Sequence, residues 1–167
     1  ISIFTFIGLL FRTPEYESQV KLLISAQKPA EAVYYKQLGY EPSAALSQSQ
    51  IVNSSAVLGL ATRALELWRK PVDYEKYFAS RFKKPFIVRR ARKVKKLLEK
   101  LDDGEKKQYL YRRALEDLKS NTTVSPIKDT NIFMITVKDF SPIGAAILAN
   151  AISRSFVIFD LEQQLAE

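Results

Sequence analysis

The chain has 167 residues, 47% of them apolar and 26% charged, which is typical of one globular domain with its own core. It contains no cysteine and no histidine. Disulfides, zinc sites built on those residues, cysteine nucleophiles and imidazole general bases are therefore excluded for this chain. The formal net charge of +8 is unevenly distributed. Residues 81–100, RFKKPFIVRRARKVKKLLEK, hold ten Lys or Arg against Glu99 alone, so this segment accounts for +9 and the remainder for −1.

The first eleven residues, ISIFTFIGLLF, carry no charge before Arg12. A membrane span needs about 20 apolar residues, so this run is too short to cross a bilayer by itself. It is either a buried strand or helix, or the end of a transmembrane helix whose beginning lies outside this sequence, and the abrupt change in polarity at Arg12 favours the second. No small-residue cleavage site of a signal peptide follows it. We expect residues 1–12 to end a transmembrane helix and residues 13–167 to form a single domain.

The segment after Arg12 alternates with a period of two, which predicts a strand with one buried face. Pro14 is acceptable at its start, where no ladder donor is required. The residues predicted to share the buried face are Tyr16, Ser18, Val20, Leu22 and Ile24. Residues 28–42 have Pro at both ends and a Gly, and are predicted to form a loop.

A helical period follows. The residues at that spacing are Ile51, Ser55, Leu58, Thr62, Leu65 and Trp68. Ser47 or Ser49 is a candidate N-cap, and Arg69 and Lys70 fall in the last turn before Pro71 ends the helix.

Residues 71–119 are predicted to be a helical insertion. Residues 72–84 are expected to be irregular or short-helical, and a helix is expected from Pro85. Its apolar stripe is Ile87, Val94, Leu98 and Leu101, and DDG at 102–104 ends it. A second helix follows, with Lys107, Leu110, Ala114 and Leu118 on one side. Two amphipathic helices with a short Gly turn predict an αα-hairpin.

The period returns to two in TTVSPI and NIFMITVKDF, which predicts an antiparallel hairpin. Ser141 is then a candidate N-cap and Pro142 the first residue of a long helix, 141–167, with no stop signal before Glu167. The predicted fold is α/β (α+β): a small mixed sheet with a C-terminal hairpin strand pair, packed by helices, with the αα-hairpin insertion and a long C-terminal helix.

Few motifs point to catalysis. The five glycines are too scattered for a dinucleotide fingerprint or a phosphate loop. Asp102 and Asp103, like Glu116 and Asp117, are sequence neighbours whose side chains point in different directions. Asp129 and Asp139 flank one strand and are expected to lie roughly 30 Å apart. We therefore expect no enzyme activity, no cofactor and no metal site.

The basic segment allows three interpretations. The first is a solvated helix face whose long side chains shield an apolar stripe. The others are contact with anionic lipid headgroups or an acidic polymer, and phosphate contacts to nucleic acid. Phe82 and Phe86 lie at one end and do not suggest a base-stacking platform. The residues of this possible anionic-partner patch are Arg81, Lys83, Lys84, Arg89, Arg90, Arg92, Lys93, Lys95 and Lys96.

The order of these segments resembles the Wzz-type chain-length determinants, also called polysaccharide co-polymerases. The resemblance covers residues 1–70 and 115–167, and the segment 71–114 has no counterpart in it. Ser141 stands where the family often has an acidic residue. The residues that carry the resemblance are Pro14, Tyr16, Ser49, Ser54, Thr130, Pro142, Ala146, Asn150 and Ala151.

The resemblance implies a domain at the bacterial inner membrane, facing the periplasm or the cell exterior and anchored by two membrane helices. It implies a non-enzymatic, ring-like homo-oligomer that regulates the chain length of a surface polysaccharide: O-antigen, capsule or exopolysaccharide. The partners that it implies are further copies of the chain, a polysaccharide polymerase or export machinery, and the lipid bilayer, with acidic glycan as a further candidate. The alternative is a basic module that binds nucleic acid through residues 81–100.

Overall fold

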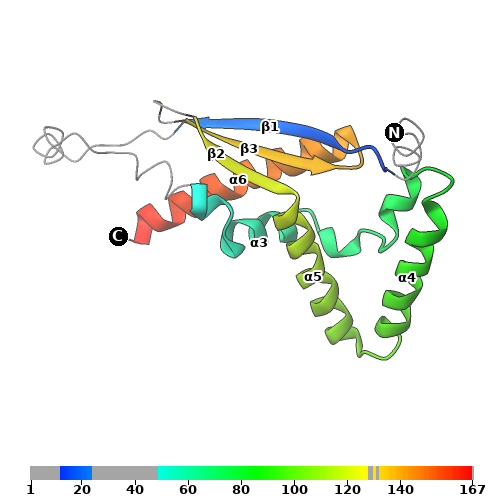
Figure 1. The fold of residues 1–167 in the computed structure, drawn as a ribbon. Helices are drawn as coiled ribbons and strands as arrows, with labels where there is room; N and C mark the ends of the chain where they lie inside the picture. The colour runs from blue at the N-terminus through cyan, green and yellow to red at the C-terminus, as the bar shows by residue number, and fades with distance from the viewer. Residues whose placement is uncertain (1–11, 24–48, 128–129, 131, 167) are drawn as a thin grey trace, which may run out of the picture.

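The computed structural model describes residues 12–23, 49–127, 130 and 132–166 (Figure 1). The predictions for residues 1–11 and for the loop at 28–42 therefore lie outside the described residues. One strand, a run of helices, two successive strands and a final long helix follow one another along the chain, which is an α+β order, as predicted. The elements are β1 (Tyr16–Leu23), α3 (Ser55–Ala64), η3 (Leu67–Arg69), η4 (Tyr74–Tyr77), α4 (Lys84–Leu98), α5 (Asp103–Ser120), β2 (Thr122–Pro126), β3 (Ile132–Asp139) and α6 (Pro142–Ala166).

The three described strands form one sheet in the order β1-β3-β2, with β3 in the centre. Both pairings are antiparallel, so the expectation of a mixed sheet is wrong and that of a C-terminal hairpin is confirmed. Ile135 lies opposite Val20 of β1 and Val124 of β2, and all three side chains point to the same face. The period of two in β1 is confirmed from Ser18 to Leu22, because Ser18, Val20 and Leu22 are half-buried and the residues between them are exposed. Tyr16, predicted on the same buried face, is exposed, because it lies at the end of the strand, and Ile24 lies outside the described residues.

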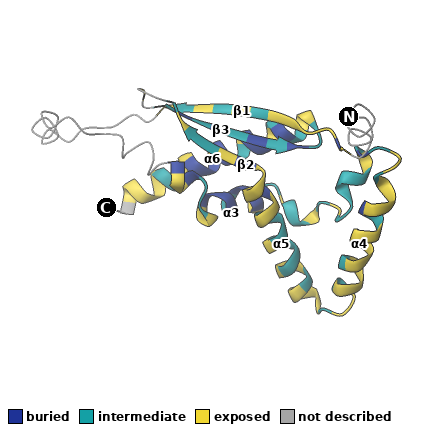
Figure 2. Ribbon diagram, in the orientation of Figure 1, coloured by how far each residue is buried: buried dark blue, intermediate teal, exposed yellow. Residues whose placement is uncertain are grey.

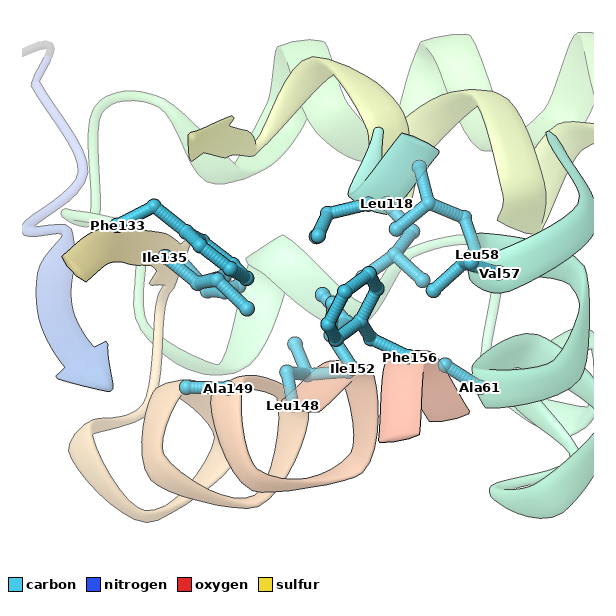
Figure 3. Packing of buried hydrophobic residues seen from close by; sticks show 12 residues of the cluster. Val57, Leu58, Ala61, Leu118, Phe133, Ile135, Leu148, Ala149, Ile152 and Phe156 are labelled. Atoms are coloured by element: carbon cyan, nitrogen blue, oxygen red, sulfur yellow. The ribbon is translucent and has the colours of Figure 1, made fainter. Parts of the chain in front are cut away.

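Helix α6 packs against β1 and β3 on one face of this sheet, and α3 packs against α6 (Figure 1). Their inward side chains form the core with those of β3 (Figure 3). The Phe133 ring meets the edge of Phe156 at a centroid distance of 5.4 Å. The buried cluster comprises Val52, Val57, Leu58, Ala61, Leu118, Phe133, Ile135, Val137, Leu148, Ala149, Ile152 and Phe156. The opposite face of the sheet is mixed: Leu23, Ile132 and Met134 lie there among polar residues. Lys138 of β3 pairs on this face with Glu17 of β1 at 3.1 Å.

The predicted helix from Ile51 to Lys70 is interrupted twice, so that prediction is wrong in extent. Residues 49–52 form a separate helical turn, and α3 begins after Ser54, whose hydroxyl accepts a hydrogen bond from the Val57 amide at 3.4 Å. Helix α3 ends at Ala64, before the predicted end, because Glu66 adopts left-handed backbone angles (φ 48°) that an α-helix cannot contain. Trp68 consequently lies in η3.

Helices α4 and α5 form the predicted helical pair, but they diverge from their connecting turn instead of packing as a hairpin (Figure 1). The turn is not made by Gly104, which lies within the first turn of α5. Asp102 caps α5, and the Asp102 amide donates a hydrogen bond to the Glu105 carboxylate at 3.1 Å, which completes a capping box. We call α4, α5 and their connecting turn (residues 84–120) the arm.

Helix α6 begins as predicted: Pro142 is its first residue, and the Ser141 hydroxyl accepts from the Gly144 amide at 3.3 Å. Its inward side is buried against the sheet, whereas its outward side is exposed along its length. By length and composition alone, Pro142–Leu165 is apolar enough to cross a membrane, with a mean hydropathy of 1.5. A helix that packs one side into a protein core also meets these criteria of length and hydropathy, and α6 packs one side into the core here.

Candidate functional site

The predicted anionic-partner patch is a basic surface on α4 and the residues that precede it. Arg81 and Lys83 lie before the helix, and the other seven residues lie within it. All are exposed except Lys83, which is half-buried. Because Ile87 and Ala91 point inward, the cations occupy the remaining sides of α4. Among the described residues, no carboxylate forms an ion pair with Arg89, Arg92 or Lys93, whose side chains are exposed.

Lys83 is the exception, because it belongs to an internal cluster rather than to the patch. Its ammonium pairs with the Glu75 carboxylate at 2.5 Å and donates to the Thr13 hydroxyl at 2.9 Å. Thr13, which is buried, donates to Glu75 at 2.7 Å. Burial acts to raise the pKa of Glu75, but the hydrogen bonds from Lys83 and Thr13 and the charges of Lys83 and Arg90 lower it overall. We call these three residues the N-terminal clamp, because they join the start of the described chain to the start of α4.

A cleft of about 410 Å³ lies between the arm, the η3–η4 segment and the end of β3. Its α4 wall includes Phe86 and Arg90, and its α5 wall includes Leu110 and Arg113. Of the side of α5 predicted from the sequence, Leu110, Ala114 and Leu118 line this cleft, and Leu118 also belongs to the core cluster. Trp68 closes part of it, with its ring 5.9 Å from that of Tyr111.

At the inner end of the cleft, Asp139 is held by two partners. Its carboxylate pairs with Lys70 at 2.9 Å and accepts from the Tyr74 hydroxyl at 3.2 Å. The Lys70 ammonium also lies 3.7 Å from the centroid of the Tyr74 ring. Burial, followed by the nearby Asp139 charge, raises the pKa of Tyr74. The arrangement neutralises a buried carboxylate and gives it no second carboxylate with which to share a proton.

The described residues contain no group of three or more Asp or Glu side chains that could hold a metal ion. The sequence neighbours Asp102 and Asp103 serve α5 instead: the first caps it, and the second pairs with Lys106 at 2.7 Å. Glu116 and Asp117 are exposed on α5. Asp129 lies outside the described residues.

The residues that carry the family resemblance lie at the ends of elements and on α6, not in one site. Pro14 and Tyr16 are exposed at the start of β1, and Ser49 is buried in the helical turn before α3. Ser54 and Pro142 begin helices. Thr130 closes the hairpin by donating to the Ile127 carbonyl at 2.8 Å and accepting from the Ile132 amide. Ala146 is half-buried, Ala151 packs against the core, and Asn150 points outward.

Sequence reasoning gave little weight to the aromatic residues at the start of α4. Phe82 and Phe86 are highly exposed there, as is Tyr77 in η4. The signal was present, since two phenylalanines four residues apart among lysines and arginines are unusual for a merely solvated helix face. Only the structure shows that neither of them enters the core.

Comparisons with protein-family models, with curated proteins and with solved structures returned no match.

Proposed function

We propose that this protein is a membrane-anchored, non-enzymatic oligomer that regulates the chain length of a bacterial surface polysaccharide. The order of the elements supports this proposal, because the resemblance to chain-length determinants rests on that order. The elements are a strand, a Ser-capped helix, a hairpin and a long helix that begins with Ser141 and Pro142. The basic arm is this chain's own addition to that order.

The proposal that the protein forms an oligomer rests on a stripe of residues on the outward side of α6. Its members recur every three or four residues, and all of them are exposed. The stripe consists of Ile143, Ile147, Asn150, Arg154, Val157, Leu161 and Leu165. Spacing of this kind is that of a coiled-coil seam, in which apolar residues pair with the same stripe of a neighbouring helix. The core lies on the other side of α6, so the stripe is open to another copy of the chain (Figure 2).

The test is to place charges in the stripe with Ile147→Asp and Leu161→Asp in the full-length protein. We expect the double variant to lose its oligomer, measured by light scattering of the detergent-solubilised protein. In a strain that lacks the wild-type gene, it should also yield an altered distribution of polysaccharide lengths on a gel. Gln163→Asp, exposed on another side of α6, is the matched control and should change neither. A double variant with wild-type mass and wild-type length distribution would contradict the proposal.

The exposed cations of α4 favour one alternative, a module that binds nucleic acid. Retention on DNA that falls steeply with salt, together with the absence of the full-length protein from the membrane fraction, would support that alternative. Membrane-embedded protein without DNA retention supports regulation of polysaccharide length.

A further inference from the structure

The start of α4 carries an exposed surface that is both aromatic and basic. Phe82 is 55% exposed and Phe86 65% exposed, and the exposed cations Arg81 and Lys84 alternate with them in the sequence. We call these four residues the aromatic–basic patch. Large apolar side chains with Lys and Arg beside them are typical of surfaces that lie in the headgroup region of a membrane.

The N-terminal clamp determines where this patch lies. Lys83, between Phe82 and Lys84, bonds to Thr13, which directly follows Arg12. The start of the described chain and the segment before α4 accordingly meet at one end of the molecule, opposite the C-terminal end of α6 (Figure 1). The patch is therefore within the reach of one lysine side chain from the point at which the apolar N-terminal sequence gives way to charge.

Under the proposed function, on which this inference rests, Arg12 lies at the membrane–water interface. The headgroup region extends roughly 5–8 Å beyond the hydrocarbon core on each side, which is close to the length of a lysine side chain. Residues clamped to Thr13 therefore lie at headgroup depth. Two cations in this position attract anionic headgroups.

We propose that the aromatic–basic patch docks the start of α4 onto the bilayer, with Phe82 and Phe86 inserted at the interface and Arg81 and Lys84 bound to anionic phospholipid headgroups. The arm is then fixed to the membrane at its α4 end, while the turn between α4 and α5 projects away from the N-terminal clamp. The cleft between the two helices opens beside the membrane surface.

Trp68 is the one tryptophan of this sequence, so a test with a single indole is possible once Trp68 and any tryptophan elsewhere in the full-length protein are replaced by Phe. In that tryptophan-free background, Phe82→Trp places an indole in the patch. Gln163→Trp places a control indole near the far end of α6, at an exposed position outside the stripe. Each full-length variant is reconstituted into discs of brominated phosphatidylglycerol and phosphatidylcholine. We expect brominated lipid to quench the emission of the first variant by about twofold or more, and to leave the second unchanged.

The outcomes separate this inference from the function on which it rests. Protein that enters the discs without quenching at position 82 overturns the docking and leaves membrane anchoring intact. Protein that fails to enter the discs overturns both.

A second experiment tests the role of the two cations. In the Phe82→Trp protein, Arg81→Gln with Lys84→Gln should reduce the quenching in anionic discs. The control pair Arg112→Gln with Lys119→Gln, from exposed positions on α5, should not reduce it. Equal quenching in neutral and anionic discs, unaffected by either pair, would overturn the assignment of anionic headgroups.

Discussion

The sheet with α3 and α6 and the arm are stabilised in different ways. Nearly all of the side chains that are fully buried belong to the first region, from Leu58 in α3 to Phe133 in β3 and Ile152 in α6. Within α4 and α5 only Ile87, Ala91 and Leu118 are buried, and most of the remaining surface is charged (Figure 2). The first region is therefore fixed by close packing, whereas the arm depends on a few contacts at its attachment points.

Those attachment points are specific. At the α4 end, Lys83 joins Glu75 and Thr13. At the α5 end, the Tyr111 hydroxyl donates to the Gly59 carbonyl at 3.4 Å. A region held in this way can move or lose a contact without global unfolding, because little apolar surface is buried with it. The comparison indicates that changes in the core alter the stability of the whole fold and that changes on the arm act locally.

The largest effect is expected in the core, with Phe133→Ala. This change removes a fully buried ring and its edge contact with Phe156, so the free energy of unfolding should fall by about 3–5 kcal/mol. Urea unfolding followed by circular dichroism measures it. Phe86→Ala on the arm is the matched comparison and should cost less than about 0.5 kcal/mol, because that ring is mostly exposed. Equal losses would remove the distinction between the two regions.

The next effect concerns Gly144, where a Cβ would lie 2.0 Å from the Asp139 Oδ2 atom. Gly→Ala within a helix ordinarily stabilises it by up to about 1 kcal/mol. Gly144→Ala should instead destabilise the protein by about 1–3 kcal/mol, because either the Asp139 carboxylate or α6 must shift. Gly104→Ala in the arm meets its nearest atom at 3.5 Å and should be neutral or stabilising in the same unfolding assay. A gain in stability from Gly144→Ala would show that Asp139 is free to move.

The sequence was sufficient to predict the features that depend on local periodicity. The alternation in β1, the hairpin of β2 and β3 and the start of α6 at Pro142 all follow from neighbouring residues. The division of the predicted 51–70 helix was missed because several serines can act as caps and no glycine marks its end. The left-handed angles of Glu66 have no sequence signature, since this conformation is uncommon for a residue other than glycine.

The candidate site was only partly predictable, for a related reason. The basic residues of α4 were visible as a charge run, and most of them are exposed as expected. Lys83 does not join that surface because its ammonium bonds to Thr13, which is 70 positions away in the sequence. The cleft depends on the divergence of α4 and α5, which two amphipathic patterns with a short turn did not predict. Contacts between distant segments decide both features.

A third prediction concerns pH at the junction of the two regions. Since burial and the Asp139 charge raise the pKa of Tyr74, the folded state holds this proton more tightly than the unfolded state. The protonated Tyr74 hydroxyl contributes fully to the free energy of unfolding below the ordinary tyrosine pKa of 10.0. This stabilisation is lost as the pH rises from there through the pKa of Tyr74 in the folded state. Tyr74→Phe should cost about 1 kcal/mol at neutral pH and should decline less than the wild type at high pH. Urea midpoints at about pH 7 and about pH 10.5 measure both effects, and parallel pH profiles would contradict the assignment.

The smallest effect is expected at the N-terminal clamp, with Glu75→Gln. The pKa of the Glu75 carboxyl is lowered in the folded state. The ionised carboxylate therefore stabilises the fold above its ordinary pKa of 4.5, and this stabilisation is lost as the pH falls through the pKa in the folded state. At neutral pH the variant should lose only about 0.5–1 kcal/mol, because the pair with Lys83 is partly exposed. Amide hydrogen exchange should nevertheless accelerate in residues 80–88, and acid should destabilise the variant less than the wild type. Glu99→Gln, exposed at the far end of α4, should change neither measurement. If exchange at the start of α4 were unchanged by Glu75→Gln, the arm would be held there by Ile87 and Ala91 alone, and its position would depend on packing as the core does.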